Sequence, residues 1–135
     1  MPGFLTDYAN NKILDLVFGS TAYTPPATLY LGLSLLPAGK NGQIYEPTGG
    51  GYARVAVANS GASFPAASAG TKSNATAAAF PAATANWGAV LSLFIADSPS
   101  GGNVIAVADL ATPKTITGGS AAATVAAGAL FLSHT

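Results

Sequence analysis

Residues 87–110, with the sequence WGAVLSLFIADSPSGGNVIAVADL, form the most hydrophobic and most clearly punctuated stretch of the chain. Residues 87–96 are apolar at almost every position, which predicts a strand that is covered on both faces. Residues 97–102 have the composition of a turn, because aspartate bonds nearby backbone, proline fixes φ and glycine accepts positive φ. A second apolar run follows over residues 103–110. The pattern predicts a β-hairpin at the core of the fold.

The chain as a whole is unusually poor in charged residues. They make up 7% of its 135 residues, and the formal net charge is zero, whereas an average soluble domain has about 25% charged residues. Such a chain has no field that would attract nucleic acid or an acidic lipid surface. It also lacks the self-repulsion that keeps small proteins apart. We therefore expect no nucleic-acid or membrane partner, and we expect self-association.

The sequence contains no cysteine, which excludes disulfides, thiol chemistry and sulfur-ligated metals. The first five residues, MPGFL, lack the basic region that opens a signal peptide. The longest nearly uncharged apolar stretch, residues 120–133, is shorter than the roughly 20 residues that span a bilayer. We expect a soluble protein that is made and used without secretion.

One helix is expected near the N-terminus, over residues 7–18. Thr6 stands at the N-cap position, Asp7 suits the positive end of the helix dipole, and Gly19 is expected to end the helix in the left-handed conformation. The apolar face predicts that the helix covers one open end or face of a β-structure, with its Leu16 buried. The residues on this face are Ala9, Ile13, Leu16 and Val17.

Several short strands are expected around the hairpin. The clearest covers residues 28–35, where leucines alternate with small or polar residues. Others are expected over residues 52–58, 71–80, 114–117 and 124–133, with a chain break at Thr112-Pro113 and a bulge at Gly128. Short strands separated by turns predict an all-β fold, an antiparallel β-sandwich of jelly-roll or immunoglobulin-like type. With the N-terminal helix, we expect it to form a single domain over residues 1–135.

No catalytic, cofactor-binding or metal site is expected. His134, the only histidine, stands next to the C-terminus, and we expect it in a solvated tail. Asp97 and Asp109 bracket the hairpin and are candidates for a carboxylate pair or a calcium site, but neither has another carboxylate nearby in the sequence. One of them sits in the Ser/Pro/Gly turn, where an aspartate is expected to bond backbone. The glycines at 49–51 lack the Lys-Ser/Thr of a phosphate loop, so we interpret them as a flexible approach to the next strand. The Asn74 sequence Asn-Ala-Thr matches a glycosylation acceptor, which matters only in a secretory pathway. We therefore expect a protein that is not an enzyme.

Arg54 is the residue that we expect to matter most for partner choice. It is the only arginine of the chain, and interfaces favour arginine over lysine and acidic residues. Alternation places it beside Tyr52, and together with Tyr30 these residues are the candidate interface. The alternatives for Arg54 are a solvated strand residue or an internal ion pair with Glu46 or Asp109. A sugar site is a further alternative for the aromatic residues Tyr30, Tyr45, Tyr52 and Trp87.

Several short motifs recur in the same order in a known protein family. They are Leu5–Ala9 through Leu14, Phe18-Gly19, Thr28–Ser34, Gly50–Val55, Asn86–Gly88, and Gly101–Asn103 through Thr112–Lys114. In these motifs, which span nearly the whole chain, the sequence resembles small virion proteins of tailed bacteriophages. Members of this family are often labelled tail-fibre proteins and occur as capsid decoration or cement proteins. The resemblance brings no catalytic residues with it.

The resemblance implies a non-enzymatic structural protein of the virion, assembled in the host cytoplasm. Our first hypothesis is a capsid cement protein that binds the major capsid protein and stabilises the shell as a symmetric oligomer. The second is a tail-fibre or tail-tip component that contacts other tail proteins. The third is a glycan-binding module that uses the tyrosines. None of the three requires a cofactor.

Overall fold

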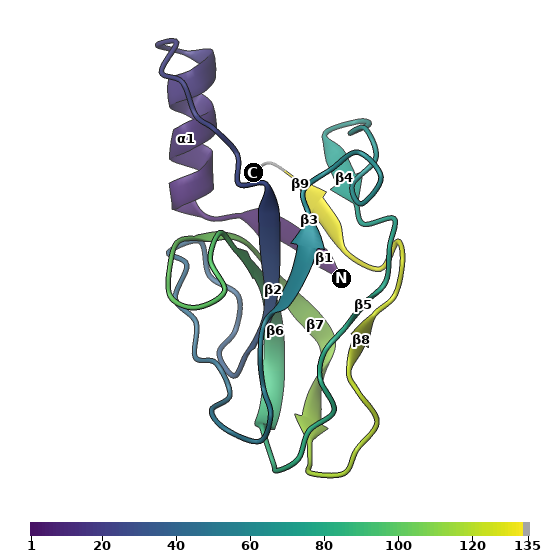
Figure 1. Ribbon diagram of the computed structural model, residues 1–135. Coiled ribbons are helices and arrows are strands. Elements are labelled where there is room, and N and C mark those ends of the chain that lie inside the picture. Colours follow the sequence, from purple (N-terminus) through teal and green to yellow (C-terminus); the bar gives the residue numbers. More distant parts are fainter. Residues whose placement is uncertain (134–135) are drawn as a thin grey trace.

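The computed structural model describes residues 1–133 and is built mostly of strands, with one helix at the N-terminal end (Figure 1). The elements are β1 (Pro2–Leu5), α1 (Asp7–Val17), β2 (Thr28–Ser34), β3 (Val55–Ala58), β4 (Thr71–Ser73), β5 (Ala78–Ala79), β6 (Gly88–Ala96), β7 (Val104–Ile116), β8 (Thr124–Val125) and β9 (Phe131–Ser133). The all-β class with one N-terminal helix is thus confirmed.

Most strands join one seven-stranded sheet of order β3-β2-β6-β7-β1-β9-β4. The sheet is antiparallel except where β1 runs parallel to β9, so it is mixed and not purely antiparallel. The second sheet is a two-stranded ribbon of β5 and β8. In Figure 1 this ribbon runs alongside the curled main sheet, and side chains from both form the larger core cluster.

The predicted hairpin is confirmed as β6 and β7, which pair with each other in the main sheet, β7 being its central strand. The carboxylate of Asp97 closes the turn, because it accepts hydrogen bonds from the backbone N–H and the side-chain amide of Asn103 at 2.8 and 3.1 Å. Both faces of β6 are covered, as predicted. Leu93 and Ile95 belong to the larger core cluster, whereas Phe94 and Ala96 belong to a smaller cluster with Val107.

The expected chain break at Thr112-Pro113 is wrong, because β7 continues through it to Ile116. On the paired strands, Ser92 lies opposite Asp109 and Val90 lies opposite Lys114. Four residues of β7, 110–113, therefore face the single residue Leu91 of β6, so β7 bulges there. A proline has no N–H to give to a ladder and is tolerated where the strand bulges out of its pairing. The predicted separate strand at 114–117 is the last part of β7.

Two of the expected long strands are each divided between the two sheets. Residues 71–80 form β4 and β5, and residues 124–133 form β8 and β9. Gly128, with φ of +76°, lies in the turn between β8 and β9 and not in a bulge. Alanine packs little surface onto a sheet, so these alanine-rich segments pair only briefly. The expected strand over 52–58 begins only at Val55, and β1 is an element that the sequence did not predict.

The N-terminal residues are joined closely to the C-terminal strand. The amino group of Met1 donates to the carbonyl of Ala129 at 2.8 Å, and the Phe131 N–H donates to the Met1 carbonyl at 3.0 Å. Strand β9 lies between β1 and β4, and it is the only described strand that pairs with β4. The far side of the sheet is therefore completed by the last three described residues.

The helix begins at Asp7 as predicted. The buried Thr6 hydroxyl caps it by accepting from the Ala9 N–H at 3.4 Å, and it donates to the Val104 carbonyl at 2.6 Å. The helix ends at Val17, one residue earlier than expected. Gly19 has φ of +136°, and it is Ser20, with φ of +55°, that takes the left-handed conformation expected of the glycine.

The predicted burial of Leu16 is wrong, because its side chain is 47% exposed. Only Ala9 and Asn10 of the helix are buried, and α1 packs against β1 and β7 near its first turn. Beyond that turn, α1 projects away from the sheet (Figure 1). An amphipathic pattern predicts an apolar face, but it does not determine whether the same chain covers that face.

The contrast between a core leucine and a helix leucine can be tested by unfolding in urea. Leu93 is 2% exposed in the larger core cluster, so Leu93→Ala is expected to lower the free energy of unfolding by roughly 2–5 kcal/mol. Leu16→Ala serves as the matched control and is expected to change it by less than about 0.5 kcal/mol. A large loss in the Leu16 variant of the isolated protein would contradict the projecting helix.

Candidate interaction surface

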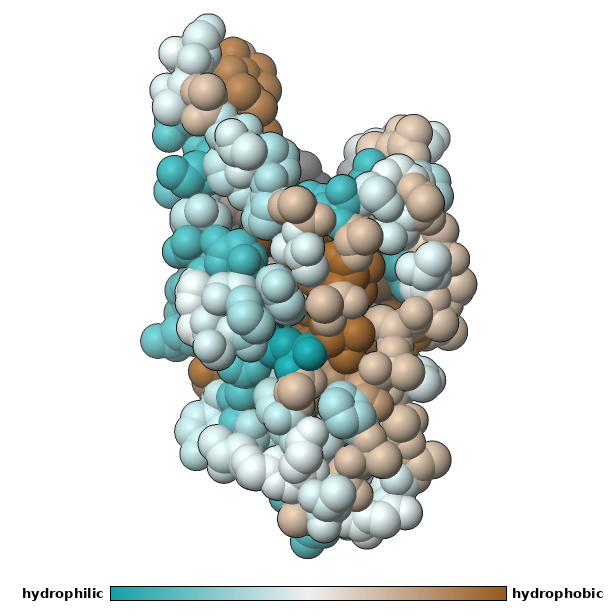
Figure 2. Space-filling view, viewed as in Figure 1, coloured by the Kyte–Doolittle hydropathy of each residue, from teal (hydrophilic) through white to brown (hydrophobic). Residues whose placement is uncertain are grey.

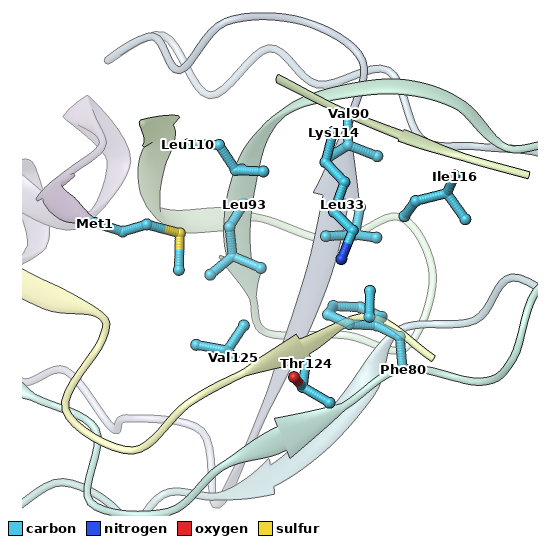
Figure 3. A pocket seen from close by; sticks show the side chains of 11 residues that line it. Met1, Leu33, Phe80, Val90, Leu93, Leu110, Lys114, Ile116, Thr124 and Val125 are labelled. Atoms are coloured by element: carbon cyan, nitrogen blue, oxygen red, sulfur yellow. The ribbon is translucent and has the colours of Figure 1, made fainter. Parts of the chain in front are cut away.

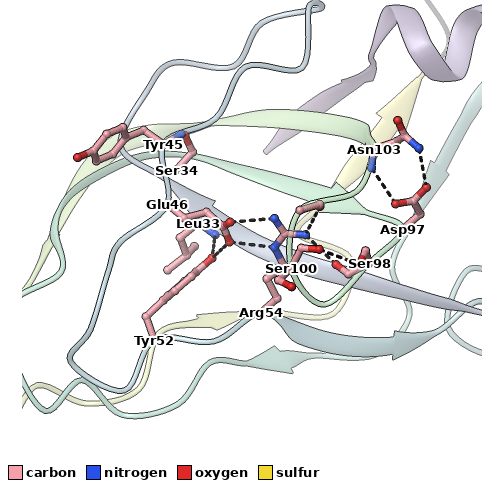
Figure 4. Close-up of polar contacts among 11 residues, drawn as sticks. Leu33, Ser34, Tyr45, Glu46, Tyr52, Arg54, Asp97, Ser98, Ser100 and Asn103 are labelled. Carbon is pink, nitrogen blue, oxygen red and sulfur yellow. Dashed lines mark hydrogen bonds and ion pairs between the residues drawn. The ribbon is translucent and has the colours of Figure 1, made fainter.

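Arg54 is held by an internal, bidentate ion pair (Figure 4). Its Nε and Nη2 atoms donate to the two carboxylate oxygens of Glu46 at 2.9 and 2.8 Å. Its Nη1 atom donates to the carbonyls of Ser98 and Gly101 at 2.7 and 2.9 Å, which ties the hairpin turn to β3. The Arg54 side chain is only 3% exposed. Arg54 therefore forms the internal ion pair with Glu46 that was one of its expected alternatives. The other expected partner, Asp109, instead accepts a hydrogen bond from the Ala38 N–H.

The guanidinium of Arg54 also covers an aromatic ring. Its Cζ atom lies 4.9 Å from the centroid of the Phe94 ring, within the range of a cation–π contact. On β2, Gly32 is paired directly with Phe94, and a Cβ atom at Gly32 would clash with the ring. The missing side chain of Gly32 therefore makes the space in which Phe94 lies. Sequence patterns alone do not pick out Gly32 or Phe94, although a lone glycine in a leucine-rich strand is a signal of close backbone approach.

Tyr52 extends the ion pair into the larger core. Its hydroxyl donates to Glu46 Oε1 at 2.8 Å and accepts from the Leu33 N–H at 3.0 Å (Figure 4). Its ring packs edge-on against Trp87 with the centroids 5.3 Å apart. The Trp87 Nε1–H donates to the Gly50 carbonyl at 2.9 Å. The glycines at 49–51 all have positive φ, and they form a turn whose Gly50 carbonyl supports the Trp87 ring.

The side chains of Arg54, Glu46 and Tyr52 keep one another in fixed ionisation states. Burial alone raises the pKa of the Glu46 carboxyl, but hydrogen bonds from Arg54 and Tyr52 outweigh it and leave this pKa below its ordinary value. Burial, together with the nearby Glu46 carboxylate, raises the pKa of the Tyr52 hydroxyl far above its usual range. Hydrogen bonding to Glu46 raises the pKa of Arg54. Groups of this kind stabilise a structure and are poorly suited to proton transfer near neutral pH.

The candidate interface residues do not all come together. Arg54 and Tyr52 meet at Glu46, where they line a shallow cleft of about 410 Å³. Tyr30 lies on β2, paired with Ala56 and Ala96 and outside this hydrogen-bonded cluster. The interface role of all three residues stays a prediction. For the sugar-site alternative, the buried Trp87 ring offers no free face, whereas Tyr45 is largely exposed.

The other candidate motifs have structural partners or lie outside the described residues. The Asn74 side chain is buried and donates to the carbonyls of Thr76 and Ala126 at 3.0 Å, while its Oδ1 accepts from the Leu130 N–H. It therefore ties the β4–β5 connection to the β8–β9 connection. His134 lies outside the described residues. Within residues 1–133, no group of three metal-ligating side chains occurs, and no helix is long and apolar enough to cross a membrane.

The most exposed apolar surface lies at the far end of α1. We define the helix end by the four large apolar residues there that are 46–76% exposed, which are Leu14, Leu16, Val17 and Phe18. Figure 2 shows this cluster in brown at the top of the molecule. The last turn contains no basic residue. Few large apolar side chains of the described residues are as exposed as these four.

A cavity of about 140 Å³ lies between the main sheet and the β5–β8 ribbon (Figure 3). We call it the apolar cavity, because its buried lining comes from Leu33, Phe80, Val90, Leu93, Ile116 and Val125. Its less buried lining residues lie on β7 (Leu110, Lys114) and around β8 (Ala123, Thr124), with Met1 beside them. The opening of the apolar cavity therefore lies between β7 and β8.

Arg54→Met is expected to lower the free energy of unfolding by about 2–4 kcal/mol. The variant leaves the Glu46 carboxylate without its partner and removes the donor from two hairpin carbonyls. Urea unfolding measures the loss. Lys40→Met, which removes an exposed cation, is the matched control and is expected to stay within about 0.5 kcal/mol of wild type. Equal losses in the two variants would contradict a structural role for the ion pair.

Glu46→Gln is expected to flatten the loss of stability in acid. Because the folded-state pKa of Glu46 lies below its ordinary value of 4.5, the carboxylate stabilises the fold fully above that value. This contribution is lost as the pH falls through the folded-state pKa. Urea unfolding at neutral pH and at about pH 3 measures the difference, with Asp15→Asn as an exposed control. An acid dependence unchanged from wild type would contradict the assigned pKa shift.

Similarity to known proteins identifies the family of the chain. No curated protein matches it. A family model described as "Podophage GP4 fiber I protein gp80" matches residues 4–133, which include every element from α1 to β9, the Arg54 cluster and the helix end. With nearly its whole length matched, the chain belongs to the podophage GP4 fiber I protein gp80 family.

Proposed function

We propose that this protein is a non-enzymatic structural subunit of the fibre of a tailed bacteriophage and contacts other virion proteins through its helix end. The observation that carries the proposal is the exposure of the helix end, where Phe18 is 76% exposed. A projecting apolar surface of this kind is hidden in an assembly. The family description supplies the kind of assembly, a phage fibre.

The polar residues support a structural role. The guanidinium of Arg54, the carboxylate of Glu46 and the hydroxyl of Tyr52 bond to one another and to backbone. Their shifted pKa values hold each group in one ionisation state around neutral pH. A catalytic acid or base would need a pKa close to the working pH. The cluster acts as a brace between β3, the hairpin turn and the larger core.

The fibre is better supported than the capsid shell as the location. The capsid-cement hypothesis rests on the resemblance to small virion proteins, whereas the family description names a fibre protein. The partners that follow are tail proteins and further copies of this chain, with no role for the major capsid protein. Assembly in the host cytoplasm into the virion follows from the same proposal.

The location can be tested on intact virions by gold-labelled antibody against the protein and by a stained gel. Label on the tail fibres, with a copy number far below that of the shell protein, is expected. Label spread over the head, at a copy number comparable to that of the shell protein, would contradict the fibre and return the protein to the cement hypothesis.

Phe18→Asp is expected to abolish incorporation into virions without destabilising the isolated protein, because this side chain is largely exposed. Phage that lack the wild-type gene, complemented with each variant and analysed by immunoblot of purified virions, provide the measurement. Tyr45→Asp is the matched control, since Tyr45 is 61% exposed but lies outside the helix end. Normal incorporation of the Phe18 variant would show that the helix end is not the contact.

A further inference from the structure

We propose that the helix end of one copy docks on the next copy, with Phe18 inserted into the apolar cavity. This inference rests on the proposed function, since it names a second copy as the partner of the helix end. One of the two surfaces is convex and the other is concave, and both are lined mainly by apolar side chains. They are complementary in shape and in hydrophobicity.

The size of the apolar cavity suits an aromatic ring. Its volume is about 140 Å³, close to that of an engineered apolar cavity of about 150 Å³ that binds benzene. The side chain of Phe18 carries a benzene-sized ring and is the most exposed member of the helix end. In Figure 3 the apolar side chains of the main sheet and of the β8 strand surround the space from both sides.

The opening of the apolar cavity is accessible because strand pairing ends there. Strand β7 pairs with β1 only as far as Ala108, so residues 109–116 have no described strand on that side. Strand β8 pairs with β5 alone. The cavity therefore opens between two strand edges that no described element covers. The helix end of a second copy can approach between these two edges without breaking any hydrogen bonds between paired strands.

The charges at the two surfaces are opposite. Lys114 lines the opening of the apolar cavity, and Asp15 lies within the helix end between Leu14 and Leu16. Both residues are exposed, and neither forms a salt bridge within residues 1–133. A lysine also suits the negative end of the α1 dipole, which has no basic residue of its own. The chain carries no net charge that would repel a second copy.

The position of the two surfaces makes the contact intermolecular and head-to-tail. Figure 1 shows the end of α1 well apart from β7 and β8, so one chain does not fill its own cavity. The helix end and the apolar cavity are different surfaces. A docked pair therefore still has one free apolar cavity and one free helix end. Such a heterologous contact propagates into an open row of subunits or closes into a ring.

Two variants of the full chain test the contact by sedimentation at a series of concentrations. Phe18→Asp removes the inserted ring, and Thr124→Trp places bulk at the opening from an exposed position. We expect wild type to form a concentration-dependent series of oligomers, and we expect each variant alone to be monomeric. Mixed in equal amounts, they should form a heterodimer and nothing larger, because only one helix end and one cavity remain functional. Tyr45→Asp should assemble as wild type does.

A charge reversal provides the second test, because both charged positions are exposed and folding is retained. Asp15→Lys and Lys114→Asp each place like charges at the contact, so each variant alone should associate about fivefold more weakly than wild type. In an equal mixture, every contact between the two different variants pairs opposite charges. The mixture should therefore regain wild-type association, and so should the double variant, which carries both reversals.

Several results would overturn the inference. Wild type that stays monomeric at every concentration would do so, as would a mixture of Phe18→Asp and Thr124→Trp that forms no heterodimer. Oligomers of Thr124→Trp alone would indicate a symmetric contact between two helix ends. A mixture of the two charge reversals that associates no better than either one alone would contradict the pairing of the two surfaces. If the isolated chain is monomeric while antibody still labels the fibres, the proposed function stands and the docking of copies fails.

Discussion

The ring of Phe94, placed on the bare backbone of Gly32, is the contact on which much of the structure depends. It fills the second face of β6, where a side chain at position 32 would leave no room. The ring needs a cover, and Arg54 supplies it. Glu46 then balances the charge of Arg54, and Tyr52 links Glu46 to the backbone of β2. The space left by the missing Cβ atom of Gly32 thus allows the Phe94 ring to be covered by Arg54, and Arg54 in turn pairs with Glu46, which Tyr52 links to the main core.

The elements with a strong period are predictable from sequence. The hairpin, the leucine strand over 28–35 and the start of the helix at Asp7 follow from alternation, turn residues and a cap, and all are present. The elements that were not predicted are too short to show a hydrophobic periodicity in the sequence. Strands β5 and β8 are two residues each, and β1 is a short segment held between β7 and β9. They pair with strands that lie far away in the sequence. The Asn74 amide also joins the loop before β5 to the loop after β8.

The candidate site is only partly predictable for the same reason. Arg54 stands out as the only arginine, and Glu46 is among its expected alternative partners. The role of Phe94 beneath it depends on the register of β2 against β6, which no local pattern determines. The exposure of the helix end escapes prediction because an apolar helix face looks the same in sequence whether its own chain or another chain covers it. The apolar cavity is formed by residues far apart in sequence and leaves no signal at all.

The place of β9 between β1 and β4 has a consequence for how the chain comes to be folded during synthesis. The strand that joins β4 to the main sheet is the last of the described residues to leave the ribosome, whereas β1 is the first. Until then β1 lacks its parallel neighbour, and the amino group of Met1 lacks its acceptor. Pairing of segments so distant in the chain is slow to form. A growing chain therefore stays open on this side until β9 has been made and has paired with β1 and β4.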